Sequence, residues 1–161
     1  MNRKYLRFRL DETTDEGGIE GHLAVRSSVD LAGEVVDRGA FKRTLAASKG
    51  VMPILFLGAS SQPYAYEPIG KWTEMREDAK GLYVKGRINL EVARGREVFA
   101  LLKQSELKGL SIGYDVLRDE VRKGVRHLLE LRLWEVSAMV LPRVVPTRPS
   151  AARRSNTRQT Y

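Results

Sequence analysis

The chain contains no cysteine, and among its 161 residues there are only two histidines, His22 and His127. The lack of cysteine excludes disulfides, thiolate zinc sites and cysteine nucleophiles. No apolar run approaches the ~18 residues of a membrane span, and the N-terminus lacks the apolar segment of a signal peptide. Phosphate-binding glycine loops, zinc-protease motifs and calcium loops are also missing. We therefore expect a cytoplasmic protein that uses no metal and no other cofactor.

The net charge of +8 is concentrated at the C-terminal end. Beyond Pro142 there are five arginines and no acidic residue, which leaves 23 basic and 20 acidic residues in the rest of the chain. A short basic tail is commonly a solvated appendage, and no stripe of interleaved aromatic and basic residues accompanies it. We expect any nucleic-acid contact to be unspecific. The change in composition predicts a domain over residues 1–142 and a basic, disordered tail over residues 143–161.

Short runs of strand-forming residues, separated by turn residues, dominate the chain before the tail. Two segments have the character of helices, at residues 40–48 and 91–107. Besides the hairpin described next, the predicted strands cover residues 4–10, 19–25, 52–57, 68–76 and 82–89. Many antiparallel strands with two helices favour a mainly β (α+β) protein, built as an antiparallel β-barrel of about seven strands with flanking helices.

The most informative segment is a predicted hairpin whose two strands carry Ser111 and Glu135. Residues 122–124, Arg-Lys-Gly, form its turn. A hairpin folded about Lys123 would place Ser111 directly opposite Glu135, with their β-carbons about 4.5–5.5 Å apart. Taken singly, each is more often an ordinary polar residue on a solvated strand face. Together, a hydroxyl and a carboxylate are two members of a hydrolytic triad. Ser137, on the face of Glu135, is a competing nucleophile or a packing residue.

The sequence does not place either histidine as the third member of the triad. His127 is eight residues from Glu135 on the same predicted strand, about 26 Å away, and should face Asp119. His22 lies on an early strand at an unknown distance from Ser111. A lone histidine on a strand is more often a surface or packing residue.

Six short segments follow one another along the chain before the tail. Two of them are Pro-Ile-Gly-Lys-Trp at 68–72 and Gly-Leu-Ser-Ile-Gly-Tyr at 109–114. The others lie at residues 39–45, 81–87, 91–97 and 133–137. In this order they resemble the prohead proteases of tailed bacteriophages, capsid-maturation serine peptidases related in fold to the herpesvirus assemblins, and the resemblance extends from about Tyr5 to Pro142.

The resemblance implies a herpesvirus-protease-like barrel and a serine endopeptidase that acts inside the immature capsid, in the host cytoplasm, on scaffold and coat proteins. Ser111 matches the family's nucleophile, and Glu135 stands where the third triad member is expected. The family's histidine follows the apolar strand at 52–57, but that position falls here on Gly58 or in a longer loop.

Because a serine without a base is a poor nucleophile, three accounts stay open. The chain is a silent homologue kept for capsid assembly or scaffold binding, that is, a pseudoenzyme. Alternatively it is a variant that lost its histidine. In the third account His22, or a histidine of another subunit in a homo-oligomer, substitutes.

Overall fold

The structure is a computed structural model, which describes residues 2–25, 29–30, 32–57, 66–104, 106–107 and 109–139. These residues form eight strands and two helices. In chain order the elements are β1 (Asn2–Thr13), β2 (Gly18–Leu23), β3 (Glu34–Val36), α1 (Lys42–Ser48), β4 (Met52–Leu57), β5 (Tyr66–Asp78), β6 (Gly81–Ile88), α2 (Ala93–Lys103), β7 (Gly109–Arg122) and β8 (Val125–Met139).

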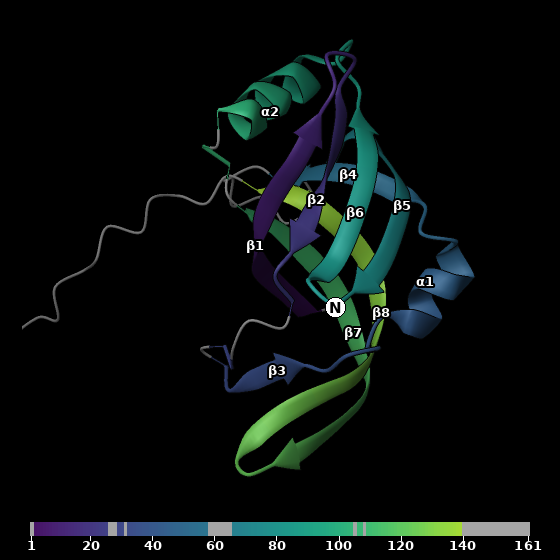
Figure 1. Cartoon of the computed structure of the whole chain (residues 1–161), viewed down its shortest axis with the longest axis vertical. Helices are drawn as coiled ribbons and strands as arrows, with labels where there is room; N and C mark the ends of the chain where they lie inside the picture. Colours follow the sequence, from purple (N-terminus) through teal and green to yellow (C-terminus); the bar gives the residue numbers. More distant parts are fainter. Residues whose placement is uncertain are drawn as a thin grey trace, which may run out of the picture.

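Seven of these strands close into a barrel, which confirms the fold expected from the sequence (Figure 1). Around the barrel the order is β8-β4-β5-β6-β2-β1-β7, and β7 pairs with β8 to complete the ring. All neighbours are antiparallel except β4 and β8, which are parallel. Since parallel neighbours need a long connection, this seam joins parts of the chain that are far apart in sequence.

Alternation of apolar and polar residues gives each barrel strand an inner face. In β7, Leu110 and Ile112 point inward and are at most 1% exposed. The largest core side chain is Trp72 on β5, whose indole N–H donates to the carbonyl of Val136 on β8 at 2.9 Å. Since β4 lies between these strands, this bond ties β5 to β8 across their common neighbour.

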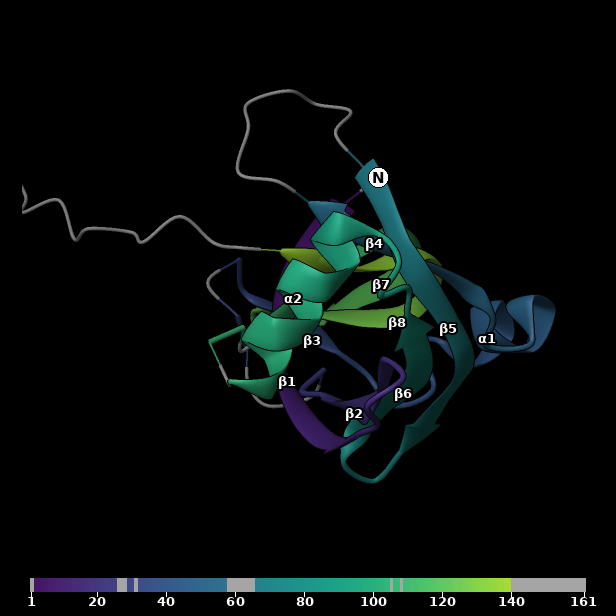
Figure 2. The ribbon, with the colours of Figure 1, turned by 90° about the horizontal axis from the view of Figure 1, so that it is seen from above.

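Both helices pack outside the barrel wall. α1 lies against β5 and β8 and buries Leu45, whereas α2 lies across one end of the barrel, as Figure 2 shows from above. α2 buries Val98, Phe99 and Leu102. It is shorter than the predicted helix at 91–107. Within the described residues, no helix combines the length and the hydropathy needed to cross a membrane.

The β7–β8 hairpin extends beyond the barrel as an arm at the bottom of Figure 1. Lys123 and Gly124 have φ values of 50° and 79°, and Arg122 pairs with Val125. Two central residues with positive φ are typical of a type I′ hairpin turn, so the turn predicted from Arg-Lys-Gly is confirmed. β3 adds to the arm by pairing in parallel with β8. The predicted tail at 143–161 lies outside the described residues.

Candidate active site

Ser111 lies in the middle of the sheet, between β1 and β8. Its pairing partners are Tyr5 on β1 and Ser137 on β8. It points to the outer face of the barrel, opposite to Ile112, yet it is only 1% exposed. Ser137 is fully buried and donates its hydroxyl to the carbonyl of Ser111 at 3.5 Å. The position is therefore held by strands on both sides, which suits a group that must keep its geometry.

Glu135 does not lie directly opposite Ser111, so the predicted pairing was wrong by two residues. Glu135 pairs with Gly113, and Ser137 takes the place opposite Ser111. One residue of this difference arises at the turn, where Arg122 pairs with Val125, so that the hairpin is centred between Lys123 and Gly124. The other arises from β-bulges between the turn and the site, whose net effect is one extra residue, Trp134, in β8. Each bulge sets two residues of one strand against one of the other, and a register counted back from the turn ignores them.

The corrected register makes Ser111 and Glu135 diagonal neighbours on the same face. Diagonal pairs are about 7–8 Å apart in the sheet, compared with about 4.5–5.5 Å for direct pairs. An imidazole between a hydroxyl and a carboxylate needs two hydrogen bonds of about 2.8 Å each, in addition to the width of the ring. The diagonal spacing leaves room for such a ring, and the direct spacing predicted from the sequence would not have done so.

The carboxylate of Glu135 is buried, and its contacts offset the cost of burying its charge only in part. The residue is 4% exposed, and its Oε1 atom has no hydrogen-bond partner among the described residues. An Nη atom of Arg3 lies 3.4 Å from Oε1. Burial raises the pKa of Glu135, and the charge of Arg3 offsets this only in part. Gly113 makes room for the carboxylate, because a β-carbon there would lie 2.7 Å from Cγ of Glu135.

A groove of about 730 Å³ lies between β1 and the end of α2. Tyr5, the pairing partner of Ser111, is one of its lining residues, and its ring covers Gly109 so closely that a β-carbon on Gly109 would overlap it. Phe8 and Leu10 of β1 also line it. The remaining lining residues are Arg7, Arg9, Leu102 and Leu107. The lining is apolar with two cations, a surface suited to a peptide that carries apolar and acidic side chains.

Arg3 and Tyr5 lie beside the candidate site residues, a placement that the sequence alone did not predict. They reach Ser111 and Glu135 because β1 pairs with β7, a contact between residues more than a hundred positions apart. The bulge at Trp134 did leave a signal in the sequence. The buried apolar residues of β8 are two apart at Leu131 and Leu133 and again at Val136 and Ala138, but three apart between Leu133 and Val136, a spacing that marks one extra residue.

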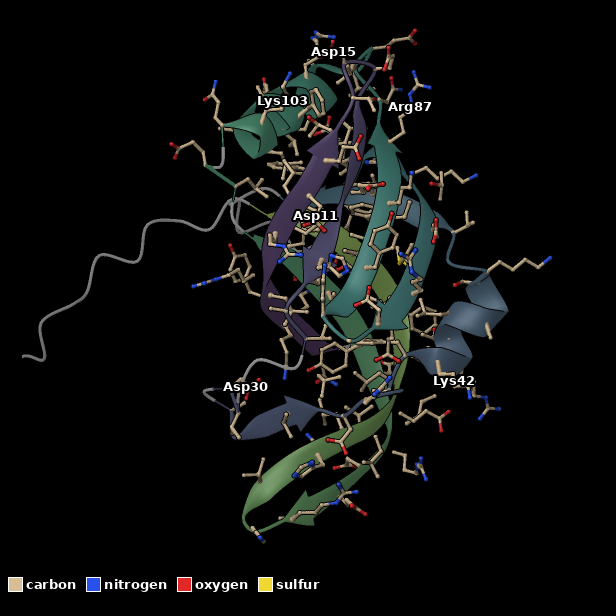
Figure 3. All side chains as sticks on the ribbon, in the orientation of Figure 1. Asp11, Asp15, Asp30, Lys42, Arg87 and Lys103 are labelled. Atoms are coloured by element: carbon tan, nitrogen blue, oxygen red, sulfur yellow. The ribbon has the colours of Figure 1, made fainter. Side chains whose placement is uncertain are left out.

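His22 is held on the barrel wall, away from Ser111. Its Nδ1 lies 2.6 Å from a carboxylate oxygen of Asp11 and its Nε2 lies 2.8 Å from one of Asp78; Figure 3 labels Asp11 on this wall. His22 pairs with Arg9, four residues along β1 from the partner of Ser111. With about 3.3 Å per residue and about 4.8 Å per strand, the two α-carbons are ~16 Å apart.

His127 lies on the arm, ten residues along β8 from Ser137, or about 33 Å at the usual rise. It pairs with Glu120, one residue from the predicted Asp119. Its Nδ1 lies 2.7 Å from a carboxylate oxygen of Asp37. Neither histidine of the same chain can therefore reach Ser111 in this arrangement.

The expected histidine position, Gly58, lies outside the described residues. In the part of the chain that the structure covers, no three His, Asp or Glu side chains come together in a way that could hold a metal ion. The carboxylates of Asp30 and Glu34 form ion pairs with Lys4, at 2.6 and 3.5 Å. Figure 3 shows Asp30 beside β3.

Comparisons with known proteins agree with this fold. A family model described as Caudovirus prohead serine protease matches residues 4–160. The chain is 30% identical over 105 residues to the prohead protease of Enterobacteria phage HK97, a match covering 65% of this chain and 45% of that protein. The chain thus aligns with less than half the length of this curated relative.

The fold is similar to that of the bacteriophage T4 capsid assembly protease. The structural match has a TM-score of 0.55 at 12% sequence identity, and it covers 87% of this chain and 99% of the other. At this identity the match supports the barrel fold alone.

Proposed function

The chain belongs to the family of caudovirus prohead serine proteases, and on that premise we propose a serine endopeptidase site with Ser111 as nucleophile and Glu135 as the carboxylate that orients a base. Its substrates are the scaffold and coat proteins of the immature capsid, in the host cytoplasm. The catalytic unit is the barrel domain at 1–142, and the basic tail at 143–161 makes no specific nucleic-acid contact.

The observation that supports this proposal best is the diagonal placement of the two groups on one buried face. Ser111 is fixed between two strands and Glu135 is buried two residues from the partner of Ser111. A carboxylate in this position stabilises an imidazolium and fixes the tautomer of the imidazole. A buried carboxylate whose Oε1 lacks a hydrogen bond among the described residues is costly, so its place beside a strand-held serine favours a functional role.

The chain departs from the family's chemistry in its base. Neither of its histidines reaches Ser111, and an isolated serine hydroxyl is a weak nucleophile at neutral pH. In subtilisin, a serine protease of a different fold, loss of the base histidine alone lowers turnover by about 10⁶-fold. We therefore expect the chain by itself to cleave its substrates far more slowly than a relative with a complete triad.

A catalytically silent homologue that acts in capsid assembly is the second candidate. The groove between β1 and α2 is open to an extended peptide of a scaffold or coat protein, and strand-like peptides bind along such edges. In this case Ser111 would be a structural residue, and the chain would bind scaffold protein without cleaving it, alone or as a homo-oligomer.

Incubation with the capsid and scaffold proteins of the same phage separates the two functions. New termini are mapped by mass spectrometry for the parent chain, Ser111→Ala and Gly58→His, with Ser137→Ala as the matched serine control. Cleavage that is lost only in Ser111→Ala supports the peptidase. Cleavage by Gly58→His alone supports a peptidase site that lacks only its base. No cleavage by any of them, with scaffold binding unchanged in Ser111→Ala, supports the assembly function.

A further inference from the structure

We propose that Glu135 and Ser111 form a binding site for an imidazole from outside the chain, supplied by a histidine side chain of the protein substrate. This inference rests on the proposed function and deepens it. The observation behind it is that Oε1 of Glu135 is buried and lacks a hydrogen-bond partner among the described residues. An acceptor left open in this way fits a ligand that carries an N–H donor.

The nearest cation does not fill this position. Arg3 approaches Oε1 only to 3.4 Å, and its guanidinium lies over the ring of Tyr66, 4.8 Å from the centroid. The Arg3 side chain is 37% exposed, so it can turn toward solvent when a ligand arrives. Oε1 therefore has a neighbouring positive charge that partly offsets the raised pKa of Glu135, but no group among the described residues donates a hydrogen bond to it.

Imidazole fits the Glu135 carboxylate and the Ser111 hydroxyl better than the side chains of lysine and arginine do. In its neutral form one ring nitrogen donates and the other accepts, so it can donate to Glu135 while it accepts the hydroxyl proton of Ser111. A lysine ammonium or an arginine guanidinium bound to the carboxylate has no acceptor to offer. The diagonal spacing of about 7–8 Å matches a ring with a hydrogen bond at each side.

A second copy of this chain is a poor source of the imidazole. His22 has carboxylate oxygens at 2.6 and 2.8 Å from its two ring nitrogens, and His127 has one at 2.7 Å. Either histidine would have to give up these contacts to reach Ser111 of a neighbour. A histidine of the substrate near the scissile bond arrives at the site with the substrate itself.

The reaction then balances without any further reagent. The substrate imidazole takes the proton of Ser111 as the serine oxygen bonds to the scissile carbonyl carbon, and Glu135 stabilises the imidazolium. The C–N bond breaks, and the imidazolium gives its proton to the leaving amine. Water then attacks the acyl ester, its proton passes to the imidazole and on to the serine oxygen, and the new carboxyl terminus is released.

The binding step is tested on the full chain with free imidazole as the probe. The side-chain carboxyl carbons of glutamate are ¹³C-labelled, and the Glu135 signal is identified by its absence in Glu135→Gln. We expect imidazole to shift this signal saturably, also in Ser111→Ala. At a pH where both bases are neutral, N-ethylmorpholine, a tertiary amine with no N–H to donate, should not shift it. A Glu135 signal that imidazole leaves in place overturns the inference, even if Ser111 proves reactive.

The chemical step is tested by labelling Ser111 with a fluorophosphonate, followed by intact mass. A general base contributes about 10²–10⁴-fold, so imidazole should accelerate labelling by about 10²-fold or more, and this gain should vanish in Glu135→Gln. If Ser111 stays unlabelled while imidazole still shifts Glu135, the proposed peptidase function fails and the imidazole site stands.

Paired peptides identify the source of the imidazole. Peptides from the scaffold protein that contain histidine are compared with copies in which that histidine is replaced by glutamine. We expect only the histidine peptides to be cleaved, and free imidazole to restore cleavage of the glutamine copies. Equal cleavage of both members of each pair, without added imidazole, would overturn the assignment of the base to the substrate.

Discussion

Replacing the buried carboxylate by an amide, Glu135→Gln, should make the protein more stable at neutral pH and abolish the carboxylate's role at the site. The substitution removes a charge that is 4% exposed and whose Oε1 lacks a hydrogen bond among the described residues. It keeps the shape of the side chain that lies over Gly113. Active-site groups commonly cost stability in this way.

The expected gain follows from the surroundings of the carboxylate. A buried polar group left without a partner costs about 1–3 kcal/mol. The neighbouring Arg3 offsets part of this cost, and the amide itself still buries polar atoms. We therefore expect a net gain of about 1 kcal/mol from the lower end of that range. For a domain of this size this corresponds to a rise in Tm of about 2–4 °C.

The effect must depend on pH with a definite sign. Burial raises the pKa of Glu135 above its ordinary value of 4.5, so the folded state binds this proton more tightly than the unfolded state. The contribution of Glu135 to stability is therefore fully present below pH 4.5 and is lost as the pH rises through the folded pKa. The advantage of Glu135→Gln should be smallest at acidic pH and largest above that pKa.

Urea unfolding of parent and variant at several pH values between 4 and 8, followed by circular dichroism, measures this difference. Glu12→Gln is the matched control, because Glu12 is an exposed glutamate on a strand and should change neither stability nor its pH dependence. A Glu135→Gln variant that is less stable than the parent at pH 7, or a difference that does not change with pH, would refute the reasoning.

Three further substitutions test the site and the barrel. Gly113→Ala should displace the Glu135 carboxylate, since the new β-carbon would lie 2.9 Å from Oε1; the ¹³C carboxyl signal of Glu135 should move, and an unchanged signal would contradict the close packing. Trp72→Phe removes the buried hydrogen bond from the indole to the carbonyl of Val136 and one of the two fused rings, so the free energy of unfolding should fall by about 1–3 kcal/mol. A loss below ~0.5 kcal/mol would show that the hydrogen bond contributes little. Burial disfavours ionisation of the two aspartates that bind His22, but their hydrogen bonds outweigh burial and lower both pKa values. His22→Gln should therefore reduce stability above pH 4 and have less effect as the aspartates become protonated. An equal loss of stability at all pH values would contradict this.

Local features of the chain were predictable from the sequence, because they depend on residues close together. The type I′ turn needs positive φ at two adjacent positions, and Lys123-Gly124 provides it. The strand at Met52–Leu57 was predicted with its observed bounds. The strands predicted at 4–10 and 68–76 are longer by two or three residues at each end, where pairing with a neighbour extends a strand beyond its own propensity. Those predicted at 19–25 and 82–89 begin one residue earlier and end one or two residues earlier. The roles of Ser111 and Glu135 remain predictions.

The sequence by itself determined the class of the fold, the hairpin that carries Ser111 and Glu135, and the motifs of the family. Only the tertiary structure decided which strands are neighbours around the barrel, and so brought Arg3 beside Glu135. It also decided the register within the hairpin. The physical reason is the same for both. Strand neighbours and bulges are selected by which side chains the closed barrel can bury, and a turn fixes register only until the first extra residue.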